Sequence, residues 1–387
     1  MMFFDHARPV PRTGRFPIIS HLEYEIDCGI IILMNKEDIK KILEAAVHAP
    51  SGDNSQPWRF RVADNRITIY NIPERDTTLY NFRERGSLVA HGALIENIVI
   101  AASHLGYRAL PILFPESDRQ EIVAAIRLEK TAPRTEPLFQ AMRERASNRK
   151  PYDPMPPTDA EREILVAAAR DPGGEIRLVE DTKSKKVIAQ AISLNERILF
   201  ENKALHTSFF QNIVWTSAEE RRKKRGLYLN TLELPPPAQV AFRLFRFWPA
   251  LKFFNMFGLS RQVAHTNATL YESSGAIGAI LMPDESPENF IRAGSILQRV
   301  WLTATTLGLS MQALAGLLYL AQRVRGEDAA MFRAEDKERI MCAYKIIESS
   351  FDAHGRRIMM LFRIGRGKKS SARSSRLPPE IAFETTA

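Results

Sequence analysis

The side chains best suited to contact a flat heteroaromatic ligand lie in one short polar loop. Residues 49–58 read Ala-Pro-Ser-Gly-Asp-Asn-Ser-Gln-Pro-Trp; they follow a helix predicted over 35–48 and lead into a predicted strand. Ser51, Asn54 and Gln56 supply a hydroxyl and two amides, so donors and acceptors alternate as the polar edge of such a ring requires. The same residues also suit a turn held by Asx and serine hydrogen bonds, and the sequence leaves both interpretations open.

A second stretch has the composition of a phosphate clamp. Residues 145–152 read Arg-Ala-Ser-Asn-Arg-Lys-Pro-Tyr, in which Arg145, Ser147 and Arg149 alternate. In an extended chain these three side chains point to one side, where two guanidinium groups and a hydroxyl could bind a phosphate. A solvated basic linker is the alternative.

The chain also resembles itself at two places. Residues 38–50 align with 160–172, and 91–106 align with 293–308 in the same order. Both members of the second pair carry an apolar stripe at helical spacing, so each predicts a buried helix. Two alignments in the same order indicate an internal duplication.

Glycines mark both ends of the longer pair. Gly92 and Gly294 stand near the start of the aligned segments, where we expect the two helices to begin. Gly106 and Gly308 stand at their ends, where a helix commonly stops on a glycine in the left-handed conformation.

The second half contains an insertion. The first alignment has an offset of 122 residues and the second an offset of 202, so the second half contains about 80 extra residues, which we expect at about 200–275 because this region reads unlike the rest. This region includes the basic run 221–225 and the segment 241–259, which is crowded with Phe, Trp and Leu. The segment suits an extra core helix, a lid over a ligand or a membrane-surface helix. We expect core or lid, because Phe and Leu recur without a clean polar face.

Long helices with few, scattered strands predict an α+β fold, with antiparallel or mixed sheets flanked by helices. The predicted strands are Trp58–Val62, Ile67–Ile72, Ala109–Phe114, Ile176–Val179, Gly278–Met282 and Arg357–Arg363.

Together the motifs resemble the nitroreductase family of FMN-dependent oxidoreductases. The loop at 49–58 is similar to that family's APSSxNxQPW loop, and 145–152 is similar to its R-x-S-x-R phosphate motif. Residues 308–316 fall where family members place a loop whose backbone N–H meets flavin N5, and 375–381 resembles the SRLPxxI ending whose arginine reaches the phosphate. The resemblance implies cofactor contacts from Pro50, Ser51, Asn54, Gln56, Arg145, Ser147, Arg149, Ala315, Gly316, Arg373 and Arg376.

The motifs are divided between the repeats. The first repeat keeps the polar loop, whereas the second keeps the phosphate motif but reads Gly-Gly-Glu-Ile after Pro172. This resembles the two-repeat Acg-type branch, in which one chain forms an internal pseudo-dimer, and implies one FMN per chain and a monomer. The expected organisation is an extension at 1–34, repeats at 35–140 and 141–365, and a basic tail at 366–387.

The resemblance implies an oxidoreductase in which NADH or NADPH reduces FMN and a nitroaromatic or quinone-like small molecule accepts the electrons, with no catalytic side chain required. The alternative is a non-catalytic FMN-binding protein of the Acg type, in which a lid covers the flavin. A third, less favoured hypothesis makes the basic segments a docking surface for nucleic acid or an anionic membrane.

Composition sets further bounds. Hydrophobic residues make up 45% and charged residues 26%, as in globular proteins, and no apolar run is long enough for a transmembrane helix. Five basic residues within 366–376 supply more than half of the net charge of +9, so we expect no nucleic-acid partner. Two distant cysteines and eight scattered histidines predict neither a disulfide scaffold nor a metal site, and they fit a cytoplasmic location.

Overall fold

The computed structural model describes residues 35–169, 173–326 and 328–384. The extension expected at 1–34 and Pro172 of the first repeat alignment lie outside the described residues. The first helix, α1 (Lys36–Ala46), begins where the Asn35 side chain caps the backbone N–H of Glu37. Its apolar residues recur at helical spacing and are buried.

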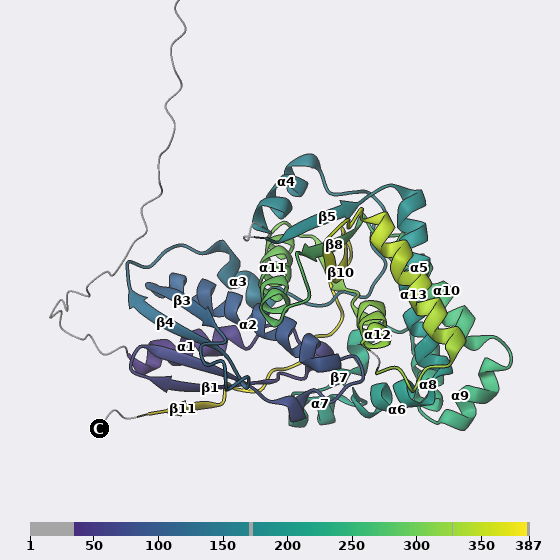
Figure 1. Cartoon of the computed structure of the whole chain (residues 1–387), viewed down its shortest axis with the longest axis horizontal. Helices are drawn as coiled ribbons and strands as arrows, with labels where there is room; N and C mark the ends of the chain where they lie inside the picture. Colours follow the sequence, from purple (N-terminus) through teal and green to yellow (C-terminus); the bar gives the residue numbers. More distant parts are fainter. Residues whose placement is uncertain (1–34, 170–172, 327, 385–387) are drawn as a thin grey trace, which may run out of the picture. The chain divides into compact units, whose positions relative to one another are not determined.

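The first half of the chain builds a five-stranded sheet in the order β11-β1-β2-β4-β3 (Figure 1). Its β1, β2, β4 and β3 are all antiparallel to their neighbours, and the C-terminal strand β11 adds to β1 in parallel. The sheet is therefore mixed, as expected. Its elements and the helices of this half are β1 (Trp58–Ala63), β2 (Arg66–Asn71), α2 (Arg85–His104), β3 (Tyr107–Leu113), β4 (Ile122–Lys130), α3 (Pro137–Glu144) and β11 (Ile381–Phe383).

The second half builds a four-stranded antiparallel sheet in the order β5-β8-β10-β9. Across the second sheet, β5, β8, β10 and β9 occupy the places that β1, β2, β4 and β3 occupy in the first sheet. The elements are α4 (Asp159–Ala168), β5 (Glu175–Val179), β8 (Ala276–Met282), α11 (Pro287–Thr306), β9 (Ser310–Ala313), α12 (Gly316–Arg325), α13 (Ala334–Ser350) and β10 (Arg357–Gly365).

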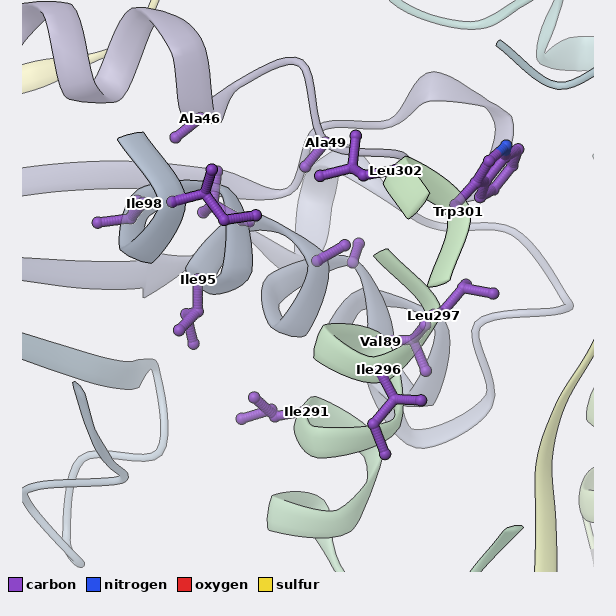
Figure 2. Close-up of a cluster of buried hydrophobic side chains, with 14 of the residues drawn as sticks. Ala46, Ala49, Val89, Ile95, Ile98, Ile291, Ile296, Leu297, Trp301 and Leu302 are labelled. Atoms are coloured by element: carbon purple, nitrogen blue, oxygen red, sulfur yellow. The ribbon is translucent and has the colours of Figure 1, made fainter. Parts of the chain in front are cut away.

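Helices α2 and α11 cross at a reciprocal pair of glycines. A Cβ atom at Gly92 would overlap the carbonyl oxygen of Ile291, and one at Gly294 would overlap that of Val89. The backbones can approach this closely only because neither position has a side chain. Figure 2 shows that side chains of both helices, among them Ile95 of α2, join one buried cluster.

The glycines do not begin these helices, as the sequence had suggested. Both helices start seven residues earlier, at Arg85 and Pro287, because the close crossing requires the glycines in the helix interior. The expected helix ends are confirmed, since Gly106 and Gly308 take φ values of 81° and 72° directly after the last helical turns.

Helices fill the connection between β5 and β8. The elements are α5 (Thr182–Glu201), α6 (Lys203–Gln211), β6 (Ile213–Val214), α7 (Ser217–Lys223), β7 (Leu227–Tyr228), α8 (Pro236–Phe245), α9 (Trp248–Asn255) and α10 (Leu259–Glu272). For 241–259 we expected core or lid, and the core contribution is partial: α8 has no buried residue and α9 buries only Leu251, whereas Phe242, Phe245, Trp248 and Leu259 are partly buried and pack against the core. The lid stays a prediction. Short 3-10 turns occur at Gly52–Asn54, Pro73–Arg75, Phe82–Glu84 and Leu229–Leu232.

The C-terminal tail returns from the second sheet to the first. It pairs beside Tyr152 at Gly367 and then reaches β1, where the N–H of Phe60 donates to the carbonyl of Glu380 at 2.9 Å. Arg75 fixes this end of the tail, because its guanidinium donates to the carbonyl of Trp58 and to the Glu380 carboxylate, at 2.8 and 2.6 Å.

One described helix, Phe82–His104, is long and apolar enough to cross a membrane by composition alone. Of its most apolar window, 78% is buried against the rest of the protein, as in the core helix of a globular fold.

Candidate functional site

The loop after α1 adopts a strained conformation. Asp53, Asn54 and Gln56 have φ values of 46°, 59° and 53°, in the left-handed region that few non-glycine residues occupy. The Ser51 hydroxyl holds the bend by accepting the N–H of Gln56 at 3.0 Å. Strain of this kind persists where surrounding contacts impose it, and it commonly marks a binding site.

The amides of this loop bind the C-terminal tail and the insertion. Asn54 Nδ2 donates to the carbonyl of Ser375 at 3.1 Å and to that of Lys224 at 3.2 Å. Gln56 Nε2 donates to the Lys224 carbonyl at 2.8 Å, and its Oε1 accepts the N–H of Leu377 at 2.9 Å. Gln56 therefore has both ends of its amide occupied by protein, whereas Asn54 Oδ1 is buried with no partner among the described residues.

Three arginines meet next to this loop. Arg145 ends α3, donates to the carbonyl of His48 at 3.0 Å and lies over the Trp301 ring at 4.7 Å. Arg373 donates to the carbonyl of Arg145 at 2.7 Å. Arg376 donates to the carbonyls of Ser374 and Ser375 at 3.0 and 3.2 Å. The tail thus brings two arginines to the one that the middle of the chain supplies.

This arginine cluster (Arg145, Arg373 and Arg376) is strongly electropositive. Burial and then the charges of Arg376 and Arg373 hold the pKa of Arg145 well below its usual range. Burial and then Arg373 lower the pKa of Arg376 to about 10. His48 responds to the same field: burial and then Arg376 and other arginines lower its pKa to about 4.

The arginine cluster fits an anion. Two of its nitrogen atoms, Nε of Arg145 and Nε of Arg376, are buried without a hydrogen-bond partner among the described residues. Glu144 raises the pKa of Arg373 and Glu220 raises that of Arg376, each against the larger lowering by burial. Glu220 also accepts hydrogen bonds from the backbone N–H and the hydroxyl of Ser375. A phosphate would supply acceptors to the unpaired nitrogens and offset the like charges, as FMN requires at its phosphate end.

Ser147 and Arg149 lie in a different environment from Arg145. The backbone of Ser147 forms a bridge with Met311, and Arg149 donates to the carbonyl of Thr231 at 2.9 Å. The charges that act on Arg149 come from Asp53 and Tyr271, rather than from Arg373 or Arg376. Arg145 and Arg149 have different neighbours because the four residues of extended chain from one to the other span about 13 Å.

Gly316 begins α12 beside a polar group that the sequence did not single out. A Cβ atom at this position would lie 2.5 Å from Asn195 Oδ1, so the glycine lets the two segments approach. Asn195 Oδ1, Glu196 Oε2 and the hydroxyl of Tyr80 are all buried without partners among the described residues. The Tyr271 hydroxyl donates to Glu196 Oε1 at 3.0 Å.

Burial dominates the electrostatics of this second group. It raises the pKa of Glu196 to about 7 and, with the charges of Glu196 and then Asp53, raises that of Tyr80. Burial and then Asp76 raise the pKa of Asp53 to about 6. Glu196 and Tyr271 come from α5 and α10, in the connection between β5 and β8, and single polar residues on amphipathic helices give no sequence signal.

The predicted site residues therefore fall into two groups. Arg145, Arg373 and Arg376 converge at one, whereas Arg149 and Gly316 adjoin the group around Asp53 and Asn195. The loop that contains Pro50, Ser51, Asn54 and Gln56 connects them. A ligand with a phosphate at one end and a polar ring at the other matches these two sets of unpaired atoms.

Comparisons with known proteins agree with this chemistry. The model of the nitroreductase family matches residues 33–81. An uncharacterized Mycobacterium tuberculosis protein is 24% identical over 326 residues, 83% of this chain and 45% of the relative. A provisionally named NAD(P)H nitroreductase of that organism, acg, is 25% identical over 191 residues, 49% of this chain and 56% of the relative. The chain thus spans about half the length of the curated relatives it matches.

Among solved structures, a nitroreductase with bound FMN from Bacteroides fragilis aligns with a TM-score of 0.33 and 9% identity, over 63% of this chain and 95% of its own. The sequence matches, together with the loop at 49–58, confirm that the chain is similar to nitroreductases and to the Acg-like proteins among them.

Proposed function

We propose that this chain, as a relative of the nitroreductases, binds one FMN and works as an NADH- or NADPH-dependent oxidoreductase. The observation that carries the proposal is the arginine cluster, in which Arg145 and Arg376 each retain a buried nitrogen without a partner among the described residues and Arg373 adds a third positive charge. Like charges are brought together at a cost in free energy, and a bound anion would offset that cost.

The residues of this chain would hold the two ends of the cofactor. Arg145, Arg373 and Arg376 would bind the phosphate, and Arg149 and the N–H of Gly316 would face the ring. The chemistry that FMN supplies when bound is acceptance of a hydride from the nicotinamide and delivery of electrons to a flat acceptor, such as a nitroaromatic or a quinone. No protein nucleophile is required.

We further infer that the two halves are copies that form an internal pseudo-dimer with one composite site. The matching strand order of the two sheets supports this, as does the reciprocal crossing of α2 and α11, where Gly92 meets Ile291 and Gly294 meets Val89. A contact in which residue i meets j and the equivalent of j meets that of i is the mark of two-fold symmetry. The proposed state is accordingly a monomer.

The first test is the visible spectrum of the purified chain, with the released chromophore identified and FMN affinity then measured by fluorescence titration. Arg145→Gln and Arg376→Gln should each weaken FMN binding by about 1–3 kcal/mol, since each removes a charged hydrogen-bond donor. The matched control is Arg66→Gln, an exposed arginine on β2. A protein that takes up no FMN, or variants that bind it like the control, would contradict the assignment.

One contact favours the alternative, an FMN-sequestering protein. The carbonyl of Lys224, at the end of α7, accepts hydrogen bonds from both Asn54 and Gln56, so the insertion covers the polar loop. Anaerobic addition of excess NADPH to the flavin-loaded protein separates the two functions. Rapid bleaching followed by turnover with a quinone supports the oxidoreductase, whereas a persistent yellow colour supports sequestration.

A further inference from the structure

Large apolar side chains are exposed together on α8, α9 and the turn that follows. Half of the exposed large hydrophobic residues of the described chain lie between 240 and 257, including four of its five exposed phenylalanines. The most exposed of these side chains are Met256 and Phe257, at 77% and 76%. The complete set is Val240, Leu244, Phe247, Phe253, Phe254, Met256 and Phe257, here called the α8–α9 patch.

On the side of the patch that faces the protein, side chains pack against neighbouring helices, and on its exposed side the aromatic rings contact one another. Trp248 packs against His206, with ring centroids 5.2 Å apart, and Leu251 is buried. On the outer face, Phe253 contacts Phe254 and Phe257, with centroids 5.6 and 5.3 Å apart. Figure 1 shows α8 and α9 beside α6 and α10, at the periphery of the helices of the insertion. An exposed cluster of large apolar side chains of this kind usually marks an interaction site.

The charged residues of the segment that contains the patch all have one sign. Residues 234–271 contain four Arg and Lys residues and no Asp or Glu. Arg246 lies over the ring of Phe247 at 4.6 Å, which joins a cation directly to the apolar surface. Lys252 and Arg261 take part in no ion pair with the other described residues. Aromatic residues interleaved with cations are the composition of segments that lie in a membrane interface.

A polar pocket of about 330 Å³ opens beside the patch. Its walls include Met256, Trp248 and three cations; Arg333 is ion-paired with Asp336, whereas Lys252 and Arg261 have no ion pair with the other described residues. The acid in its wall is Glu201, which already accepts from Ser260 and Arg197 at 2.8 and 2.9 Å. An anionic headgroup could therefore enter next to the side chains that would contact its acyl chains.

We propose that the α8–α9 patch docks on a membrane surface rich in anionic phospholipid, with the neighbouring pocket receiving a lipid phosphate. A second copy of the chain is a poorer occupant, because a two-fold contact would place the same cations opposite one another with no acid on this segment to pair them. The interaction is peripheral, and it does not depend on the proposed flavin chemistry.

The test is co-sedimentation of the full chain with vesicles of phosphatidylcholine alone or of phosphatidylcholine mixed equally with phosphatidylglycerol. We expect binding to the mixed vesicles that falls with added salt. The paired change Met256→Ser with Phe257→Ser should lower partitioning at least roughly tenfold. Lys252→Gln with Arg261→Gln should lower partitioning roughly thirtyfold, because each cation near an anionic surface contributes about 1 kcal/mol.

Matched controls are Met155→Ser, on a side chain that is 60% exposed elsewhere, and Lys186→Gln on the exposed side of α5. Because the changed apolar residues lie at the surface, circular dichroism should show unaltered folding. Equal binding to both vesicle types, or patch variants that bind like the controls, would overturn the proposal. So would a dimer in light scattering that the Met256 and Phe257 changes convert to monomer while vesicle binding is absent.

Discussion

His48 should act as a reporter of the arginine cluster, and changing Arg376 to Gln should alter how it titrates. The pKa of His48 is lowered to about 4, first by burial and next by Arg376, with smaller contributions from Arg143, Arg373 and Arg145. A neutral glutamine keeps much of the shape of the arginine and removes its charge. The variant should therefore raise the pKa of His48 but leave it below the ordinary 6.5, because burial is unchanged.

The size of the change follows from Coulomb's law. One nearby charge in a partly screened site contributes on the order of 1 kcal/mol, and because one pKa unit corresponds to about 1.4 kcal/mol, removing it should raise the pKa of His48 by somewhat less than one unit. Since the folded pKa lies below 6.5, the unfolded chain binds more protons between those values, and stability is lost as the pH falls through this window. The full difference corresponds to about 3 kcal/mol; because His48 is only half-buried, solvent screening should leave about 1–2 kcal/mol.

The assay is NMR titration of the histidine ring protons, with His48→Gln used to assign the signal. Anion-free wild type, Arg376→Gln and the control Arg66→Gln are compared, and each is repeated with inorganic phosphate. Phosphate should raise the pKa of His48 in the wild type, because bound negative charge offsets the field of the arginines. A wild-type His48 that titrates near 6.5, or an equal pKa in Arg376→Gln and the control, would refute the electrostatic description of this cluster.

Two further predictions concern stability, and both are measured by urea unfolding. Gly294→Ala should destabilise the protein by about 3 kcal/mol or more, since its methyl group would collide with the Val89 backbone, whereas Gly86→Ala would meet only an Asn81 side-chain oxygen at 3.2 Å; equal unfolding midpoints would contradict the close helix crossing. Burial raises the pKa of Glu196 to about 7, so between pH 4.5 and 7 the folded state holds a proton that the unfolded state has lost, and the free energy of unfolding falls as the pH rises through this window. The free energy of unfolding of Glu196→Gln, relative to that of wild type, should therefore be about 1–3 kcal/mol greater at pH 8 than at pH 5. A difference between the two proteins that does not change with pH would contradict this.

Much of the local structure could be predicted from the sequence. The six predicted strands are confirmed as β1, β2, β3, β5, β8 and β10, with ends shifted by a few residues, because each is a short apolar run next to turn residues. The loop at 49–58 lies between α1 and β1, as expected. Strand β4 was missed because Ile122–Lys130 is rich in alanine and buried on both faces, so it lacks alternation. Strands β9 and β11 were missed because they have four and three residues.

The site illustrates where local patterns stop being informative. From their alternate spacing, Arg145 and Arg149 were predicted to bind the same phosphate. They face different neighbours, because the extended chain between them carries their side chains to separate places. Gly92 and Gly294 were predicted to begin helices, yet they are placed by the partner helix that crosses at each one. Neither outcome depends on nearby residues, so no local rule could have supplied it.

By itself, the sequence determined the residue types of the polar loop and of the arginine segments, the helix and strand periods, and the resemblance to nitroreductases. These follow from spacing and composition, which act over a few residues. Only the tertiary structure decided that the tail brings Arg373 and Arg376 to Arg145, that Asn195 stands beside Gly316, and that Phe253 and Phe254 of α9 are exposed while Phe242 and Phe245 of α8 pack inward. Such contacts join residues tens to hundreds of positions apart, and burial against distant partners fixes them.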